Sequence, residues 1–148
     1  MRARVKFEKN GIMRYVGHLD LMRFFQKAVK RSELPIKYSE GFNPLQIMSF
    51  ASPLGVGLTS AGEYMDIDLK EQVACDKALL TLNENMVEGL IITGFKYLPD
   101  DAEKCMSAVT AASYIVTYKD SKDDACYIDN ICDFFSCCST PSSISYRF

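Results

Sequence analysis

The order in which strand-like and helix-like periodicities follow one another constrains the fold more than any other feature. Residues 3–9 (ARVKFEK) alternate apolar and charged side chains, which is typical of a strand with one buried face. From residue 18 to about residue 31, Leu21, Met22, Phe25, Ala28 and Val29 fall on one side of a helical projection, with cations opposite. This pattern predicts an amphipathic helix, which Pro35 ends.

The rest of the first hundred residues predicts further strands and one more helix. Asn10-Gly11 predicts a turn, after which residues 12–16 are expected to pair back as a short hairpin arm. The order of elements is strand, helix, strands, helix, strand, which predicts an α+β fold, a ferredoxin-like βαββαβ sandwich. The later strands are expected at residues 35–39 (PIKYS), 46–52 (QIMSFAS), 63–69 (EYMDIDL) and 90–98 (LIITGFKYL), and the second helix at 74–86 (ACDKALLTLNENM).

The length of 148 residues allows one good core with a small appendage. We expect a ferredoxin-like domain over residues 1–98, a linker over 99–106 and an incomplete second β-α unit over 107–148, packed on the first domain or on a second copy. Within that unit, residues 113–119 predict a strand, residues 123–138 a helix, and the last ten residues a final strand.

Composition excludes several classes of protein. With 48% hydrophobic and 24% charged residues the chain is expected to fold, and no apolar run reaches the roughly 18 residues of a membrane helix. The first residues (MRARVKFEKNG) lack the apolar core of a signal peptide, so we expect a cytoplasmic protein with no membrane contact. The six cysteines contain no C-x-x-C pair and are interpreted as thiols, so neither a metal nor a cofactor is expected.

Charge is distributed unevenly along the chain. Residues 1–50 carry ten Lys or Arg against four acids, a balance of +6, whereas residues 51–148 carry seven against fifteen, a balance of -8. A basic half is compatible with a polyanion-binding face, although an ordinary solvated surface gives the same count. If Arg4 and Lys6 face away from the helices, they belong to the open sheet face instead of joining the helical cations. The candidate basic patch is Arg4, Lys6, Arg14, Arg23, Lys27, Lys30, Arg31 and Lys37.

Three short blocks carry a resemblance to a known family: residues 17–23 (GHLDLMR), 38–44 (YSEGFNP) and 49–57 (SFASPLGVG). Together they resemble bacterial domains of unknown function linked to radical SAM enzymes, which occur alone or fused to radical SAM and cobalamin-binding proteins, often near genes for ribonuclease E or G. The resemblance implies a radical SAM protein as partner and brings no established reaction. The motif residues it marks as a candidate ligand site are Gly17, His18, Asp20, Arg23, Tyr38, Ser39, Glu40, Gly41, Phe42, Asn43, Pro44, Ser49 and Ser52.

The chain departs from that family where members usually read FNPHPKISFA. Leu45 and Gln46 stand in place of the usual His and Pro, so a second histidine that could partner His18 is absent. His18 either fills space under the first helix or acts as a general base or phosphate contact, with Glu40 as its better partner if the 38–44 turn folds back over the helix start. The turn itself is either an ordinary Gly-Asn-Pro turn or a binding loop for a nucleobase.

These observations leave three functional hypotheses open. The first is a non-catalytic accessory module for a radical SAM enzyme that binds tRNA, another structured RNA or an RNA-processing partner. The second is a metal-independent ribonuclease or RNA-modifying enzyme that uses His18. The third is a protein-binding scaffold that forms a homodimer. Asp66 and Asp68 share a strand face and could hold Mg²⁺, but two carboxylates that keep a sheet face soluble explain the same pattern.

Overall fold

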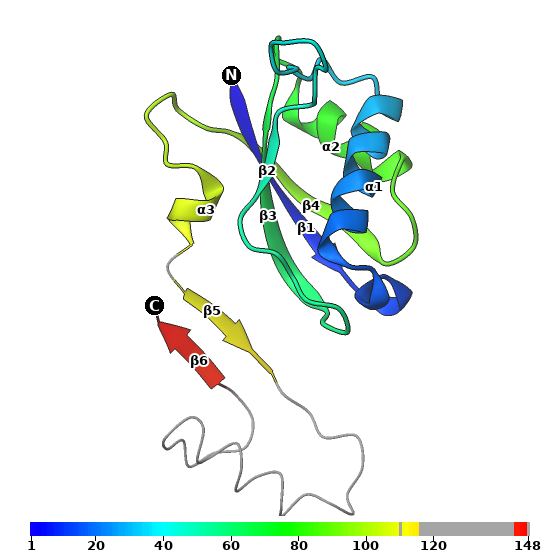
Figure 1. Ribbon diagram of the computed structural model, residues 1–148, viewed down its shortest axis with the longest axis vertical. Helices are drawn as coiled ribbons and strands as arrows, with labels where there is room; N and C mark the ends of the chain where they lie inside the picture. The colour runs from blue at the N-terminus through cyan, green and yellow to red at the C-terminus, as the bar shows by residue number, and fades with distance from the viewer. Residues whose placement is uncertain (110, 116–143, 148) are drawn as a thin grey trace, which may run out of the picture. The chain divides into compact units, whose positions relative to one another are not determined.

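The computed structural model describes residues 1–109, 111–115 and 144–147 of the chain (Figure 1). Met1–Val109 form one compact unit, and Thr110–Phe148 belong to a second. In the second unit, β5 (Ala111–Tyr114) pairs antiparallel with β6 (Ile144–Arg147). The helix expected over residues 123–138 lies outside the described residues.

The first unit is built on a four-stranded sheet with the order β2-β3-β1-β4. Every neighbouring pair is antiparallel, so β2 runs parallel to β1, and β4 runs parallel to β3. A helix crosses between each parallel pair, and the prediction of a ferredoxin-like α+β sandwich is confirmed. The elements are β1 (Arg2–Lys9), α1 (His18–Arg31), β2 (Met48–Phe50), β3 (Ser60–Asp68), α2 (Cys75–Glu84) and β4 (Leu90–Tyr97).

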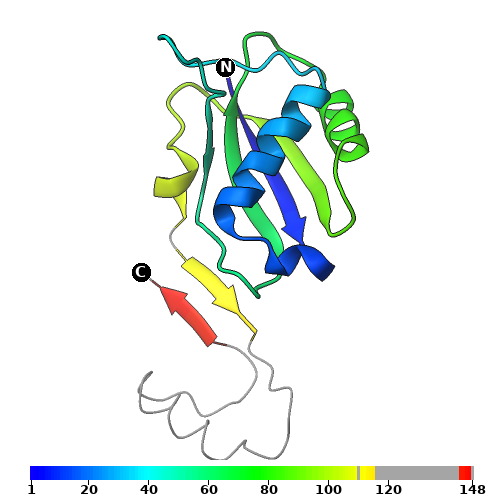
Figure 2. The same cartoon turned by 45° about the vertical axis from the view of Figure 1, so that its right-hand side comes forward.

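Helices α1 and α2 lie on one side of the sheet and enclose the core (Figures 1 and 2). The helix expected from residue 18 to 31 has those bounds, and its apolar side is the buried side. Burial removes this apolar surface from water, which supplies about 1.5–3 kcal/mol for each large side chain. No helix in the described part of the chain is long and apolar enough to cross a bilayer. The buried residues of α1 are Leu21, Phe25, Ala28 and Val29.

The hairpin arm expected after Asn10 is not formed. Residues Gly11–Tyr15 instead make a short 3-10 helix, η1, whose Met13 is buried. The prediction is wrong because β1 is a central strand, paired with β3 on one edge and β4 on the other, and has no free edge for a third partner. Gly11 adopts a φ of 56°, which favours glycine, and directs the chain into this turn.

The strand expected over residues 35–39 is also absent. That segment makes only two isolated bridges, Ile36 with Leu69 and Tyr38 with Gln46. The strand that runs parallel to β1 is β2, which comes after the 38–44 turn and not before it. Because the turn comes before β2, it lies at the end of the sheet where β1 begins.

The segment after β4 returns to the sheet. It includes the short helix α3 (Cys105–Ala108), which packs against β2 and β3 on the side away from α1 and α2 (Figure 1). The buried Cys105 donates its backbone N–H to Asp66 Oδ2 at 2.8 Å and its thiol to the Ser49 carbonyl at 3.2 Å. Residues 99–106, expected as a linker, thus lie within the first unit.

Candidate nucleic-acid interface

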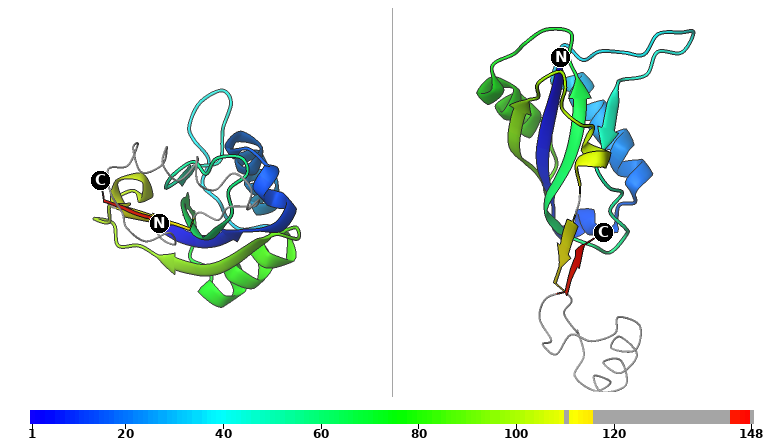
Figure 3. Two further views of the ribbon diagram at one scale, coloured as in Figure 1. Left: turned by 90° about the horizontal axis from the view of Figure 1, so that it is seen from below. Right: turned by 90° about the vertical axis from the view of Figure 1, so that its left-hand side faces the viewer.

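Residues 37–47 form a loop that projects from the first unit. Ser39 N–H bonds the Leu45 carbonyl at 2.8 Å, and Leu45 N–H bonds Ser39 Oγ at 3.0 Å, so two antiparallel arms are held together. Gly41, with a φ of 125°, reverses the chain at the tip. Figure 3 shows this loop extending beyond the body of the unit in both views. We call residues 37–47 the projecting loop.

Phe42 at the tip of the projecting loop is fully exposed, with a relative exposure of 108%. Its neighbours Gly41, Asn43, Pro44 and Leu45 are exposed as well, so nothing in the described part of the chain covers the ring. Burial of a phenyl ring would stabilise the fold by about 1.5–3 kcal/mol, and an exposed ring does not supply this stabilisation. Among the large apolar side chains of the described residues, Phe42 is the most exposed.

The outer side of α1 carries a row of exposed cations. Asp20 pairs with Arg23 at 3.3 Å, and both side chains are 69% exposed, so this pair adds little to stability. Lys27, Lys30 and Arg31 are exposed and have no ion-pair partner among the described residues, and the same holds for Lys37 at the root of the projecting loop.

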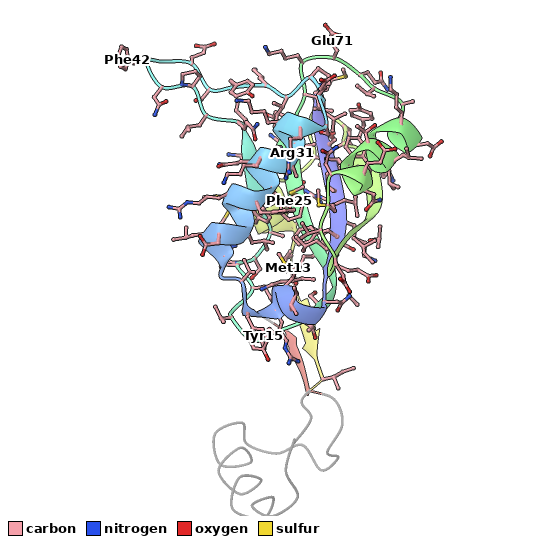
Figure 4. The ribbon with its side chains drawn as sticks, turned by 90° about the vertical axis from the view of Figure 1, so that its right-hand side faces the viewer. Met13, Tyr15, Phe25, Arg31, Phe42 and Glu71 are labelled. Atoms are coloured by element: carbon pink, nitrogen blue, oxygen red, sulfur yellow. The ribbon has the colours of Figure 1, made fainter. Side chains whose placement is uncertain are left out.

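Phe42 and Arg31 lie at one end of the unit, and Met13 and Tyr15 lie at the other (Figure 4). The projecting loop extends sideways beyond α1 in this view. The exposed ring and the last turn of α1 therefore occupy the same end. We call Arg23, Lys27, Lys30, Arg31 and Lys37, together with Phe42, the α1–loop surface.

The expected pairing of His18 with Glu40 does not form. Lys37 N–H bonds the Asp68 carbonyl beside the start of β1, whereas His18 follows the end of β1. The eight residues of β1 separate these two ends by about 25 Å at the rise of a strand. The prediction that the turn covers the helix start is wrong. A histidine at position 45, as in the usual family pattern, would lie in the projecting loop and could not meet His18 either.

His18 begins α1 and packs against the aromatic core. Its ring lies edge-on to Phe50, with centroids 5.3 Å apart and planes at 86°. Nearby, Gly57 N–H bonds the Arg14 carbonyl at 2.7 Å, and a side chain at Gly17 would touch Val56. Two of the three motif blocks therefore meet at this end. No carboxylate bonds the His18 ring within the described residues, so the contacts shown are those of packing.

Lys9 is a buried charge that the sequence analysis did not predict as a candidate residue. It has no exposed surface, and its ammonium donates to the Val16 carbonyl at 2.8 Å. Burial lowers the pKa of Lys9, and the nearby Glu63 carboxylate opposes that change. The alternation of residues 3–9 places Lys9 on the same face as Val5 and Phe7, so the sequence contained the signal.

Arg4 and Lys6 do not belong to the α1–loop surface, because alternate residues of β1 face away from the helices. Arg4 makes a two-bond pair with Asp66, Nε to Oδ1 at 2.8 Å and Nη2 to Oδ2 at 3.1 Å, and also bonds the Glu103 carbonyl. The bond to Asp66 is the main cause that raises the pKa of Arg4. The expected basic patch is thus divided between two faces.

The two strand acids proposed for Mg²⁺ are already engaged. Asp66, 4% exposed, bonds Arg4 and the backbone of Cys105, and Asp68 lies 3.6 Å from Arg2. No group of three or more His, Cys, Asp or Glu within the described ranges could hold a metal ion. Asp66 therefore fastens the segment after β4 to the sheet, and Asp68 pairs with the start of β1.

The candidate residues are distributed over four places. Tyr38, Ser39, Glu40, Gly41, Phe42, Asn43 and Pro44 lie in the projecting loop, and Lys70 stands 6.0 Å from the Tyr38 ring. Gly17, His18 and Arg14 lie at the start of α1, while Ser52 is exposed just after β2. Ser49 contacts Cys105 on the open face. The structure brings together the loop and the end of α1, and it keeps both apart from His18.

The chain matches a bacterial family over residues 2–136, and the description of that family is "uncharacterized protein conserved in bacteria (DUF2344)". The match covers most of the chain, so the protein belongs to this family. A search of curated proteins finds no match.

Proposed function

We propose that the protein is an RNA-binding accessory module that contacts structured RNA through the α1–loop surface. The observation that carries this proposal is Phe42, a fully exposed ring at the same end of the unit as Arg31, the last residue of the cationic side of α1. Cations bind phosphates without regard to sequence, and an exposed ring stacks on an unpaired base. An RNA stem with an unpaired loop supplies both the phosphates for the cations and the unpaired base for the ring.

Each component has an expected size. A phosphate contact by Lys27, Lys30 or Arg31 contributes roughly 0.7 to 0.9 to the slope of log affinity against log salt, for single strands and duplex respectively. Stacking of one base on Phe42 contributes about 1–3 kcal/mol, or roughly five- to 150-fold in affinity. Loss of the ring should weaken binding at every salt concentration, whereas loss of a cation should change the slope.

The experiment measures binding of a tRNA and of a hairpin RNA to the full chain by fluorescence anisotropy at several salt concentrations. Lys30→Gln is compared with Lys77→Gln, an exposed cation of α2 that lies outside the α1–loop surface. The proposal requires that Lys30→Gln lowers the salt slope by about one contact and that Lys77→Gln leaves it unchanged. Equal effects of the two variants, or no binding at low salt, would refute it.

The proposed partner is a radical SAM protein, on the basis of the three motif blocks. The projecting loop and the start of α1, which carry those blocks, lie at opposite ends of the unit and offer separate surfaces for RNA and for a protein. Co-purification with a radical SAM protein from the same bacterium tests this part, and Leu19→Ser at the start of α1 tests the surface. A complex unaffected by Leu19→Ser, or no complex at all, would count against it.

A further inference from the structure

The segment after β4 is bound to the open face of the sheet through its backbone. We call residues 99–108 the return segment. Arg2 Nη1 donates to the Ala102 carbonyl at 3.3 Å, and Arg4 Nη2 donates to the Glu103 carbonyl at 2.9 Å. Arg2 and Arg4 lie on the same face of β1, so their guanidinium groups bind consecutive carbonyls. Neither bond depends on the side chains that residues 102 and 103 carry.

Cys105 is the buried residue of the return segment, with a relative exposure of 1%. Its N–H donates to Asp66 Oδ2 at 2.8 Å, and its thiol donates to the Ser49 carbonyl at 3.2 Å. Asp66 also pairs with Arg4, so one carboxylate connects the two groups of contacts. The open face therefore accepts a main-chain N–H together with one small side chain.

Little apolar surface holds the return segment in place. Its other side chains are exposed or half-buried, and Met106 keeps 65% of its surface exposed. A depression of about 250 Å³ is lined by Lys104 together with Met48 and Ser49 of β2, so the segment does not fill the space beside that strand. A part of a protein with few buried apolar contacts opens at a lower free energy than the whole fold. The return segment has this character.

We propose that Arg2, Arg4, Asp66 and Ser49 form a peptide-binding site, which the return segment of the same chain occupies and from which it detaches while the sheet stays folded. The ligand is a stretch of peptide with two consecutive carbonyls, followed two residues later by a main-chain N–H and a small side chain. A short tether supplies such a segment at an effective concentration in the millimolar range. None of these groups belongs to the α1–loop surface, so the site does not depend on the proposed function.

The first test empties the site and supplies the segment as a separate peptide. Cys105→Arg places a long charged side chain where a thiol is buried, so the return segment should leave the sheet. The ¹⁵N-labelled full chain with this substitution is titrated with a reduced synthetic peptide of residues 99–108. The amide signals of Ser49 and Asp66 should shift toward their positions in the unmodified chain and saturate at millimolar peptide. The unmodified chain, whose site is filled, should show no saturating shift.

Matched variants separate the site from non-specific binding. A peptide that itself carries Cys105→Arg should not bind. Arg2→Met, added to the Cys105→Arg chain, should weaken binding about two- to tenfold, the scale of one hydrogen bond, whereas Lys6→Met, at another outward position of β1, should not. Equal binding of the two peptides, equal effects of Arg2→Met and Lys6→Met, or no saturation in a folded Cys105→Arg chain would refute the site.

The second test measures detachment in the unmodified chain and needs no variant that must fold. Iodoacetamide reaches the buried Cys105 thiol only when the return segment opens or the whole fold unfolds, and mass spectrometry identifies the alkylated cysteine. If the segment opens alone, little surface is exposed, so the alkylation rate at Cys105 should change little at low urea concentrations. An alkylation rate that rises with urea as steeply as global unfolding does would show that the segment leaves only with the fold, and detachment would be wrong.

Discussion

The two ends of α1 are built in opposite ways. At the start of the helix, Lys9 and Met13 are buried, and Asn10 N–H bonds the Gly89 carbonyl at 2.7 Å. We call this region, from Lys9 to His18 with Gly89, the helix-start end. Beyond the other end of the helix, Lys37 and Ile47 at the root of the projecting loop bond Asp68 of β3. From Ser39 to Leu45 the bonds run only between the two arms of the loop, and Phe42 at its tip is fully exposed.

This difference separates residues that stabilise the fold from residues that can contact a partner. Side chains at the helix-start end have neighbours on several sides, so a change there must cost stability. Side chains at the tip of the projecting loop have few neighbours, so a change there that keeps the backbone conformation leaves the free energy of unfolding nearly constant. Binding at the tip can therefore be tested without loss of stability, whereas the buried residues of the helix-start end are explained by packing.

The largest effect is expected for Gly89→Ala at the helix-start end. Gly89 has a φ of 91°, and a side chain there would bring its first carbon within 2.5 Å of the Asn10 backbone oxygen. The strained backbone and the clash with main chain together should cost about 3 kcal/mol or more of unfolding free energy, measured in urea.

Gly41→Ala in the projecting loop is the matched control. Gly41 also has a positive φ, 125°, but a side chain there meets nothing within 4 Å. It should cost only the backbone term, about 1–2 kcal/mol. If the two variants lost equal stability, the contrast between the two ends would not hold.

The next effect is expected for His18→Ala. This variant removes the edge-on contact with Phe50 and should lower the free energy of unfolding by about 1–2 kcal/mol. His18→Phe keeps an aromatic ring on Phe50 and should recover most of that loss. RNA affinity should be the same in all three proteins. An unchanged stability combined with lost RNA processing would instead make His18 a functional residue.

A smaller effect, visible mainly through pH, is expected for Lys9→Met. The pKa of Lys9 is lowered in the folded protein, so between that pKa and 10.5 the unfolded chain binds more protons. The free energy of unfolding should therefore rise with pH through this window, and Lys9→Met should remove that rise. Near pH 7 the substitution should change stability by about 1 kcal/mol or less, because a hydrophobic residue replaces a buried charge.

Urea titrations at several pH values below 10.5 measure the Lys9 contribution. Lys77→Met, at an exposed position of α2, is the control and should leave the pH profile unchanged. A profile that stays the same in Lys9→Met would mean that the ammonium is solvated in the folded protein.

The comparison of the two ends also explains what the sequence could predict. The helix from His18 to Arg31 and the inward face of β1 follow from local periodicity, which needs no knowledge of the rest of the chain. The place of the 38–44 turn depends on which segment returns along the sheet. Strands were expected at both 35–39 and 46–52. A strand at 35–39 parallel to β1 would have carried the turn back toward His18, but the strand that forms is Met48–Phe50, within the second range.

The bonding partners of the acidic residues on β3 could not be predicted from local sequence either. Asp66 and Asp68 alternate as expected, but their partners Arg4, Cys105 and Arg2 come from the first strand and from the segment after the last one. Strand alternation shows which face a carboxylate occupies and does not show what reaches it from elsewhere.

The smallest change in stability is expected for Phe42→Ser, and it has the largest consequence for binding. The ring makes no contact that folding would lose, so the free energy of unfolding should change by less than about 0.5 kcal/mol. Affinity for a hairpin RNA with an unpaired loop should nevertheless fall at least about fivefold, while Phe42→Tyr, which still stacks, should retain it. A loss of stability in Phe42→Ser would show that the ring packs on the protein, and equal affinity of Phe42→Ser and the unmodified chain would remove the projecting loop from the interface.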